Sequence, residues 1–144
     1  MRNFISSSGA KVTPGQAAGN ADGPHADLTY KIIGCAIKVH KELGPGYLES
    51  IYENALAIEL QRQGLAFERQ KVVKILYQGQ EVGEHRIDLL IESTVLVELK
   101  SVEEVVKKHV AQVISTMKAA GAKVALLMNF NETQMIDGIQ RIVL

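Results

Sequence analysis

Apolar residues recur every three or four positions in three stretches of the chain, and this spacing predicts three amphipathic helices. Asp27 or Thr29 can cap the first helix, and Gly44-Pro45-Gly46 ends it because proline cannot continue a helix. The second helix runs from about Leu48 to Gln63, and the third covers Val102–Ala120. The apolar positions of the first helix are Ile32, Ile33, Ala36, Ile37, Val39 and Leu43.

Runs rich in β-branched and other apolar residues predict the strands. Phe67–Tyr77 and Glu81–Ile91 flank a turn at residues 78–80, as in a hairpin. The remaining predicted strands are Val95–Lys100, Lys123–Phe130 and a last edge strand over Ile139–Leu144. The order α-α-β-β-β-α-β, with a final β, predicts an α/β fold in which helices pack on a mixed sheet.

Residues 1–27 show neither a helix nor a strand period, and they hold four of the 12 glycines and two of the three prolines. We therefore expect residues 1–27 to be a flexible, disordered tail and residues 28–144 to be the folded domain. No apolar stretch of a secretory signal stands in the tail, so a cytoplasmic location is expected.

The composition excludes several classes of protein. With 16 Lys and Arg against 16 Asp and Glu, the net charge is zero, which argues against gripping nucleic acid by bulk charge alone. The one cysteine, Cys35, excludes an internal disulfide framework and a multi-cysteine zinc site, and its apolar neighbours predict core packing. No apolar run is long enough to span a bilayer, so no membrane association is expected.

The most informative residues lie in two neighbouring predicted strands. Side chains alternate faces along a strand, so Glu98 and Lys100 point the same way, and in a hairpin Asp88 can lie beside Glu98. Two carboxylates that close repel each other unless a cation or a proton separates them, and Mg²⁺ or Mn²⁺ prefers such oxygen ligands. A solvated sheet face with a Glu98–Lys100 ion pair is the more common explanation for such residues, but the apolar runs around them weaken it.

The second helix adds a group of polar residues on an apolar stripe. Glu49, Tyr52 and Glu53 share one face, and burying an acid there is costly unless something pairs with it. Glu49 is also explained by the start of the helix, where the helix dipole favours negative charge, whereas Glu53 is less easily explained so.

On the third helix, His109, Gln112 and Thr116 line one margin of the apolar face. A lone histidine in such a place is more often packed and hydrogen-bonded than catalytic. Gln112 could reach the same cleft as the strand acids, or could simply be exposed.

Several segments, in order, resemble a known family. The stretch Gly46-Tyr47-Leu48-Glu49-Ser50-Ile51-Tyr52 matches the motif of the GxxExxY proteins, which are placed in the PD-(D/E)XK nuclease superfamily. The resemblance covers Leu28–Leu144. The further matching segments are Arg86-Ile87-Asp88-Leu89-Leu90, Val97-Glu98-Leu99-Lys100, His109-Val110-Ala111-Gln112 and Asn129-Phe130-Asn131.

The resemblance implies a restriction-endonuclease-like αβββαβ core with a site on the sheet. In that site Asp88 and Glu98 would be metal ligands and Lys100 the catalytic lysine. Glu49 or Glu53 would complete the site, with Glu49 slightly favoured as the glutamate of the motif and as a metal ligand. Gln112 would correspond to a glutamine that related nucleases carry, although Thr116 stands where those relatives often have a tyrosine.

The implied function is Mg²⁺-dependent or Mn²⁺-dependent hydrolysis of phosphodiester bonds in DNA or RNA. The alternative is a catalytically inactive interaction or nucleic-acid-binding module on the same fold, because function depends on the site and not on the fold. A homodimer packed through the first helix is left open.

Overall fold

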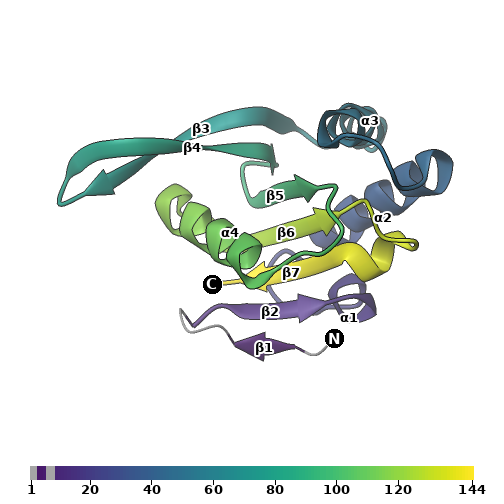
Figure 1. Ribbon diagram of the computed structural model, residues 1–144, viewed down its shortest axis with the longest axis horizontal. Coiled ribbons are helices and arrows are strands. Elements are labelled where there is room, and N and C mark those ends of the chain that lie inside the picture. Colours follow the sequence, from purple (N-terminus) through teal and green to yellow (C-terminus); the bar gives the residue numbers. More distant parts are fainter. Residues whose placement is uncertain (1–2, 6–8) are drawn as a thin grey trace.

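A seven-stranded sheet runs through the computed structural model, which describes residues 3–5 and 9–144 (Figure 1). Its strands in chain order are β1 (Phe4–Ile5), β2 (Lys11–Pro14), β3 (Phe67–Tyr77), β4 (Gln80–Ile91), β5 (Val95–Lys100), β6 (Val124–Asn129) and β7 (Ile139–Val143). The helices are α1 (Gln16–Gly19), α2 (Ala26–Leu43), α3 (Glu49–Arg62), α4 (Lys107–Ala120) and the short 3₁₀ helix η1 (Met135–Gly138).

The strands lie in the order β1-β2-β7-β6-β5-β4-β3. Only β5 and β6 pair in parallel, and every other neighbouring pair in this order is antiparallel. Parallel neighbours need a long crossover connection, and α4 supplies it between β5 and β6. The predicted α/β fold with a mixed sheet and flanking helices is confirmed.

Each face of the sheet has its own apolar core. Under α2 and α3, Tyr52 stacks on Phe130 with ring centroids 4.5 Å apart, and both side chains are fully buried. Under α4, Val113 and Met117 pack against sheet residues such as Leu96 and Leu127. The sheet is therefore covered on both faces, and polar side chains inside it need partners.

The hairpin of β3 and β4 reaches beyond the rest of the sheet. The two strands pair from Phe67 and Ile91 to Tyr77 and Gln80, but β4 pairs with β5 only over Leu89–Ile91. Val73 and Ile87 are still buried under α4, and beyond them the outer part of the hairpin, residues 74–84, projects from the body as a two-stranded arm (Figure 1). From Asp88 toward the tip of the hairpin, β4 is therefore no longer paired with β5.

The structure differs from the predicted flexible tail. Lys11–Pro14 pair with β7, and Ala10 and Val12 are fully buried on the α4 side of the sheet. This short strand is stabilised by its pairing with β7, which the local pattern of apolar residues does not predict. It also makes β7 an interior strand rather than the predicted edge. Residues 1–2 and 6–8 of the predicted tail lie outside the described residues.

The third predicted helix begins at Lys107, five residues later than the apolar pattern indicates. The side chain of buried Asn129 accepts a hydrogen bond from Val102 N (3.1 Å) and donates one to Val102 O (2.9 Å). Because both backbone groups of Val102 are bonded to β6, the chain leaving Lys100 stays extended before α4 starts.

Candidate active site

Asp88 and Glu98 face each other where β4 separates from β5. The Asp88 Oδ2 atom accepts a hydrogen bond from Leu99 N (2.8 Å), and Glu98 Oε1 lies 3.4 Å from Asp88 N. Each acid thus occupies the place of a backbone acceptor that the separating strand no longer provides. The alternation of side chains along the strands brings these two carboxyl groups together, as the sequence indicated.

Both carboxyl groups are harder to ionise than usual. Burial raises the pKa of Glu98 to about 8, with repulsion from Asp88 adding to it and Lys100 lowering it. Burial also raises the pKa of Asp88, and the charge of Glu53 adds to that effect against the bonds from Leu99 and Gln70. Neither acid has a cationic side chain within 4 Å in the described chain. At neutral pH the pair therefore retains a proton or needs a cation.

The helix acid that reaches this pair is Glu53, which is buried on α3. Its Oε1 atom accepts a hydrogen bond from Gln70 Nε2 (2.6 Å), and the same Nε2 lies 3.3 Å from Asp88 Oδ1. Its Oε2 atom accepts from Arg69 Nε (2.9 Å) and forms an ion pair with that guanidinium. Gln70 therefore links the acid of α3 to the acid of β4.

Glu49 lies elsewhere. It is exposed in the first turn of α3, and its side chain makes no hydrogen bond or ion pair with another described residue, as expected where the helix dipole favours an acid. The prediction that favoured Glu49 over Glu53 rested on the motif alone, and the geometry favours Glu53.

Tyr52 of the same motif has a structural position. Its hydroxyl donates to Gly44 O (2.6 Å) and accepts from Tyr47 N (3.1 Å), which holds the turn between α2 and α3. Ser101 Oγ donates to Tyr47 O (2.6 Å), so this turn is tied to the end of β5 next to Lys100.

On the α4 side, Glu98 and Lys100 open into a hollow of about 190 Å³. Lys100 is partly buried, and its side chain forms no hydrogen bond or ion pair within the described chain. Gln112 lines the same hollow although it is largely exposed. The structure therefore places Gln112 beside Glu98 and Lys100 but not in a bond to either. The other residues lining the hollow are His85, Arg86, His109, Val113 and Thr116.

Hydrogen bonds orient the two histidines of this hollow. Thr116 Oγ1 donates to Gln112 O (2.9 Å), so it accepts from His85 Nδ1 at 2.9 Å. His109 Nδ1 accepts from Val106 N (3.0 Å), which leaves the proton of a neutral ring on Nε2. Val106 O in turn accepts from His109 N (2.9 Å), so His109 also fixes the start of α4.

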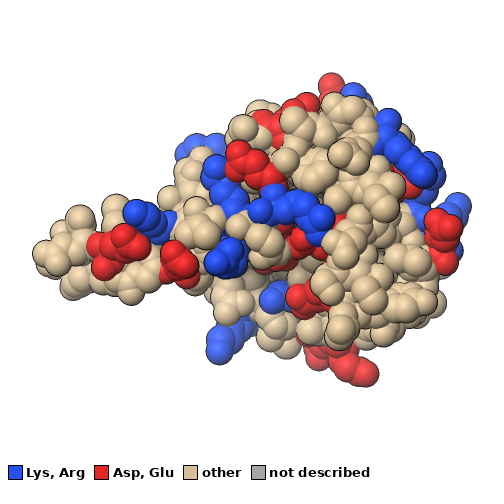
Figure 2. Space-filling model, turned by 90° about the horizontal axis from the view of Figure 1, so that it is seen from above, with Lys and Arg blue, Asp and Glu red and all other residues tan. Residues whose placement is uncertain are grey.

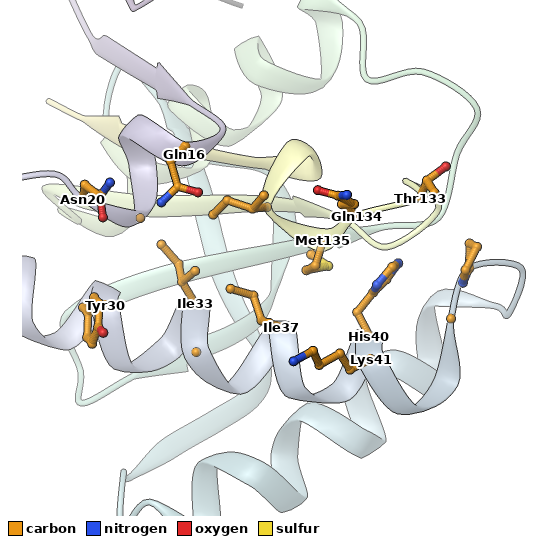
Figure 3. Close-up of a pocket in the computed structure, with 15 residues that line it drawn as sticks. Gln16, Asn20, Tyr30, Ile33, Ile37, His40, Lys41, Thr133, Gln134 and Met135 are labelled. Carbon is orange, nitrogen blue, oxygen red and sulfur yellow. The ribbon is translucent and has the colours of Figure 1, made fainter.

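A larger hollow, about 810 Å³, lies along α2 between α1 and the segment before η1 (Figure 3). No acidic residue lines it, and its His40 already bonds through Nε2 to Glu132 O (2.8 Å). Size alone does not make it the reactive site, because the residues able to bind a cation or a phosphate gather at the smaller hollow.

The charges around the acid pair are mixed. In Figure 2, Lys and Arg side chains lie next to Asp and Glu side chains where the arm joins the body, and both kinds continue onto the arm. Among residues 3–5 and 9–144, no group of three or more His, Cys, Asp or Glu side chains gathers as a complete metal site. A cation at Asp88 and Glu98 would therefore take its other ligands from water or substrate, as Mg²⁺ commonly does.

Two contributors to the site were not singled out by the sequence. Arg69 and Gln70 lie in β3, where nothing about their spacing distinguishes them from the other exposed polar residues of that strand. The sequence of β3 does not indicate that the side chains of Arg69 and Gln70 both turn toward α3.

In the part of the chain that the structure describes, no helix has the length and apolar character to cross a bilayer.

Comparison with known proteins gives one family. The model of the PD-(D/E)XK nuclease superfamily matches residues 26–142, which include both strand acids, Lys100 and Glu53. Searches of curated proteins and of solved structures gave no match. The sheet and its flanking helices are consistent with the restriction-endonuclease-like fold of that superfamily. With this match over most of its length and an acid pair where β4 leaves β5, the chain belongs to the PD-(D/E)XK nuclease superfamily.

Proposed function

We propose that this protein is a metal-dependent nuclease of the GxxExxY type that hydrolyses phosphodiester bonds of nucleic acid. The observation that carries the proposal is the half-buried Asp88–Glu98 pair, which has no cationic partner within 4 Å in the described chain. In a member of the PD-(D/E)XK nuclease superfamily, such a pair would serve to bind a divalent cation.

The donor set fits a divalent cation. Asp88 and Glu98 supply carboxylate oxygens. Burial and repulsion from Asp88 raise the pKa of Glu98, and a bound cation would favour the ionised carboxylates. When bound there, Mg²⁺ or Mn²⁺ would act as a Lewis acid on water and on the phosphate. Glu53 is held by Arg69 and Gln70 behind this pair, which suits a supporting acid better than a direct ligand.

Lys100 is the residue of this chain that can act on the reacting atoms. Its ammonium group is unpaired in the described structure and shares a hollow with Glu98. There it can hold an attacking water or a phosphate oxygen by hydrogen bonds that strengthen as negative charge develops. Arg86, His109 and Gln112 line the same hollow and present groups able to hold neighbouring substrate phosphates or sugars.

The test is a cleavage assay with Mg²⁺ or Mn²⁺ on single-stranded, duplex and branched DNA and RNA. Asp88→Asn is expected to lower cleavage more than about 100-fold, since even supporting groups of metal sites are worth about 10- to 100-fold. Lys100→Ala is expected to lower kcat while leaving the binding of Mn²⁺ nearly unchanged.

A thermal melt with increasing Mn²⁺ accompanies the assay. A specific site stabilises the fold and so raises Tm. The stabilisation is about 2.7 kcal/mol when the Mn²⁺ concentration is 100 times the dissociation constant, and Asp88→Asn should remove it. Equal cutting by the wild type and Asp88→Asn would contradict the assignment. No cutting together with no Mn²⁺ response would favour an inactive binding module on this fold.

A further inference from the structure

Gln70 has an unusual backbone for its place in a strand. Its φ is +52°, a left-handed conformation that is unfavourable for a residue with a Cβ atom. The other described non-glycine residues with positive φ are in turns or at a helix cap, namely His25, Gln78, Glu92 and Ser93. Gln70 instead lies within β3, where extended backbone was available to it.

The kink changes where the side chains of β3 point. In a regular strand, neighbouring residues face opposite sides of the sheet. Here the consecutive residues Arg69 and Gln70 both bond to the carboxylate of Glu53, one at each oxygen. The left-handed backbone between them accounts for this shared target.

The kink also interrupts the hairpin opposite Asp88. The strands pair at Arg69 with Leu89 and at Lys71 with Ile87, but the intervening Gln70 and Asp88 are not paired. In place of a backbone ladder, Gln70 Nε2 approaches Asp88 Oδ1 at 3.3 Å while Leu99 N donates to Oδ2 at 2.8 Å. The Asp88 carboxylate is thus held at both oxygens.

We propose that Gln70 is a positioning residue, kept in a strained backbone so that its amide orients the Asp88 carboxylate and couples it to Glu53. This inference rests on the proposed nuclease function, since it assigns Gln70 to the same site. Strain of this kind persists where the surrounding structure requires it, and active sites are a frequent place for it. Its removal should make the fold more stable and the site worse.

The experiment compares Gln70→Gly, Gln70→Met and the matched control Gln78→Gly. Gln78 has φ +50° in the turn at the tip of the arm, away from the acids, so glycine there relieves a similar backbone without touching the site. Gln70→Met keeps the length of the side chain and the strained backbone but removes the N–H donors. For each variant, the Tm without metal, the Mn²⁺ dissociation constant from electron paramagnetic resonance, kcat and KM are measured.

We expect Gln70→Gly and Gln78→Gly to keep or raise the metal-free Tm, and Gln70→Met to leave it nearly unchanged. Both Gln70 variants should weaken Mn²⁺ binding or lower kcat by about 10- to 100-fold, with KM much less affected. Gln78→Gly should match the wild type in Mn²⁺ binding, kcat and KM.

Two outcomes would overturn the positioning role while the nuclease function stands. In one, Gln70→Gly and Gln70→Met melt well below an active wild type, which would make Gln70 a residue of the fold. In the other, both variants bind Mn²⁺ and cut like the wild type. If the wild type itself neither binds Mn²⁺ nor cuts, the proposed function fails and the positioning role falls with it.

Discussion

Acids withdrawn from solvent occur both in α3, where they are buried, and at the junction of β4 and β5, where they are half-buried, and the two regions balance their charge differently. Glu59 on α3 is 8% exposed, and its carboxylate lies 3.4 Å from Lys38 Nζ and 3.3 Å from Arg62 NH1. Asp88 and Glu98 instead lie beside each other, without a cationic side chain within 4 Å in the described chain. The chain therefore neutralises Glu59 by itself but leaves the strand pair with an unmet need for positive charge.

Glu53 on α3 is also neutralised by a cationic side chain of the protein. Its carboxylate pairs with the Arg69 guanidinium at 2.8 Å, so both buried glutamates of α3 have a cation from the chain. Burial of an acid is thus not by itself a sign of function in this protein. What distinguishes Asp88 and Glu98 is that two acids share one place and the nearby Lys100 does not form an ion pair with either.

The largest expected contrast between the two regions is in activity. Glu98→Gln should lower metal-dependent cleavage more than about 100-fold, because it removes a proposed ligand. Glu59→Gln is the same change at a buried glutamate of α3 and should leave kcat within about 2-fold, since the ion pairs of Glu59 are with Lys38 and Arg62 and not with residues of the site. Steady-state kinetics on the best substrate of the panel measures both. A similar loss of kcat in the two variants would show that the Asp88–Glu98 pair is no more important for cleavage than the ion-paired Glu59.

The next contrast is in how stability depends on pH. The pKa of Glu98 in the fold is about 8, above its ordinary value of 4.5, so the folded protein binds a proton that the unfolded chain has lost. The metal-free protein should therefore lose stability as the pH rises from about 4.5 to about 8, by on the order of 1 to 3 kcal/mol.

Chemical denaturation at a series of pH values measures this slope. Glu98→Gln should flatten it, because the glutamine side chain has no carboxyl group to titrate. Saturating Mn²⁺ should also reverse the slope in the wild type, since protons compete with the cation for the carboxylates. A slope unchanged in Glu98→Gln would place the titrating group elsewhere.

The smallest expected effect concerns one cation of the balanced region. Lys38→Ala should lower the free energy of unfolding by less than about 1 kcal/mol, because the Lys38 side chain is 64% exposed and Arg62 remains beside Glu59. Urea denaturation at low and high salt measures it, and the difference should shrink at high salt. A much larger loss would mean that Glu59 depends on Lys38 alone.

Much of the scaffold of the site followed from local patterns. The strands Phe67–Tyr77 and Val95–Lys100 have the predicted bounds, and α3 differs from the prediction by about a residue at each end. The predicted cap of the first helix was wrong, because α2 begins at Ala26 with His25, not Asp27 or Thr29, at its N-cap. The alternation of side chains was enough to predict that Asp88 and Glu98 would meet. Such inferences succeed because helix and strand periods are local properties of the backbone.

Long-range bonds explain where the prediction and the structure differ. The sequence pattern could not show that Asn129 bonds both backbone groups of Val102 and so delays α4. Nor could it show that Lys11–Pro14 pair with β7, because the two segments are far apart in the chain. A four-residue strand has too short a pattern to be recognised before its partner is known.

By itself, the sequence determined the fold class, the strand carrying each acid and the presence of Lys100 on the same face as Glu98. Only the tertiary structure decided that Glu53, not Glu49, reaches Asp88, and that it does so through Gln70. The physical reason is that this link depends on a left-handed backbone within β3 and on the packing of α3 beside that strand. Neither feature produces a periodic pattern in the sequence, so neither can be predicted from the sequence alone.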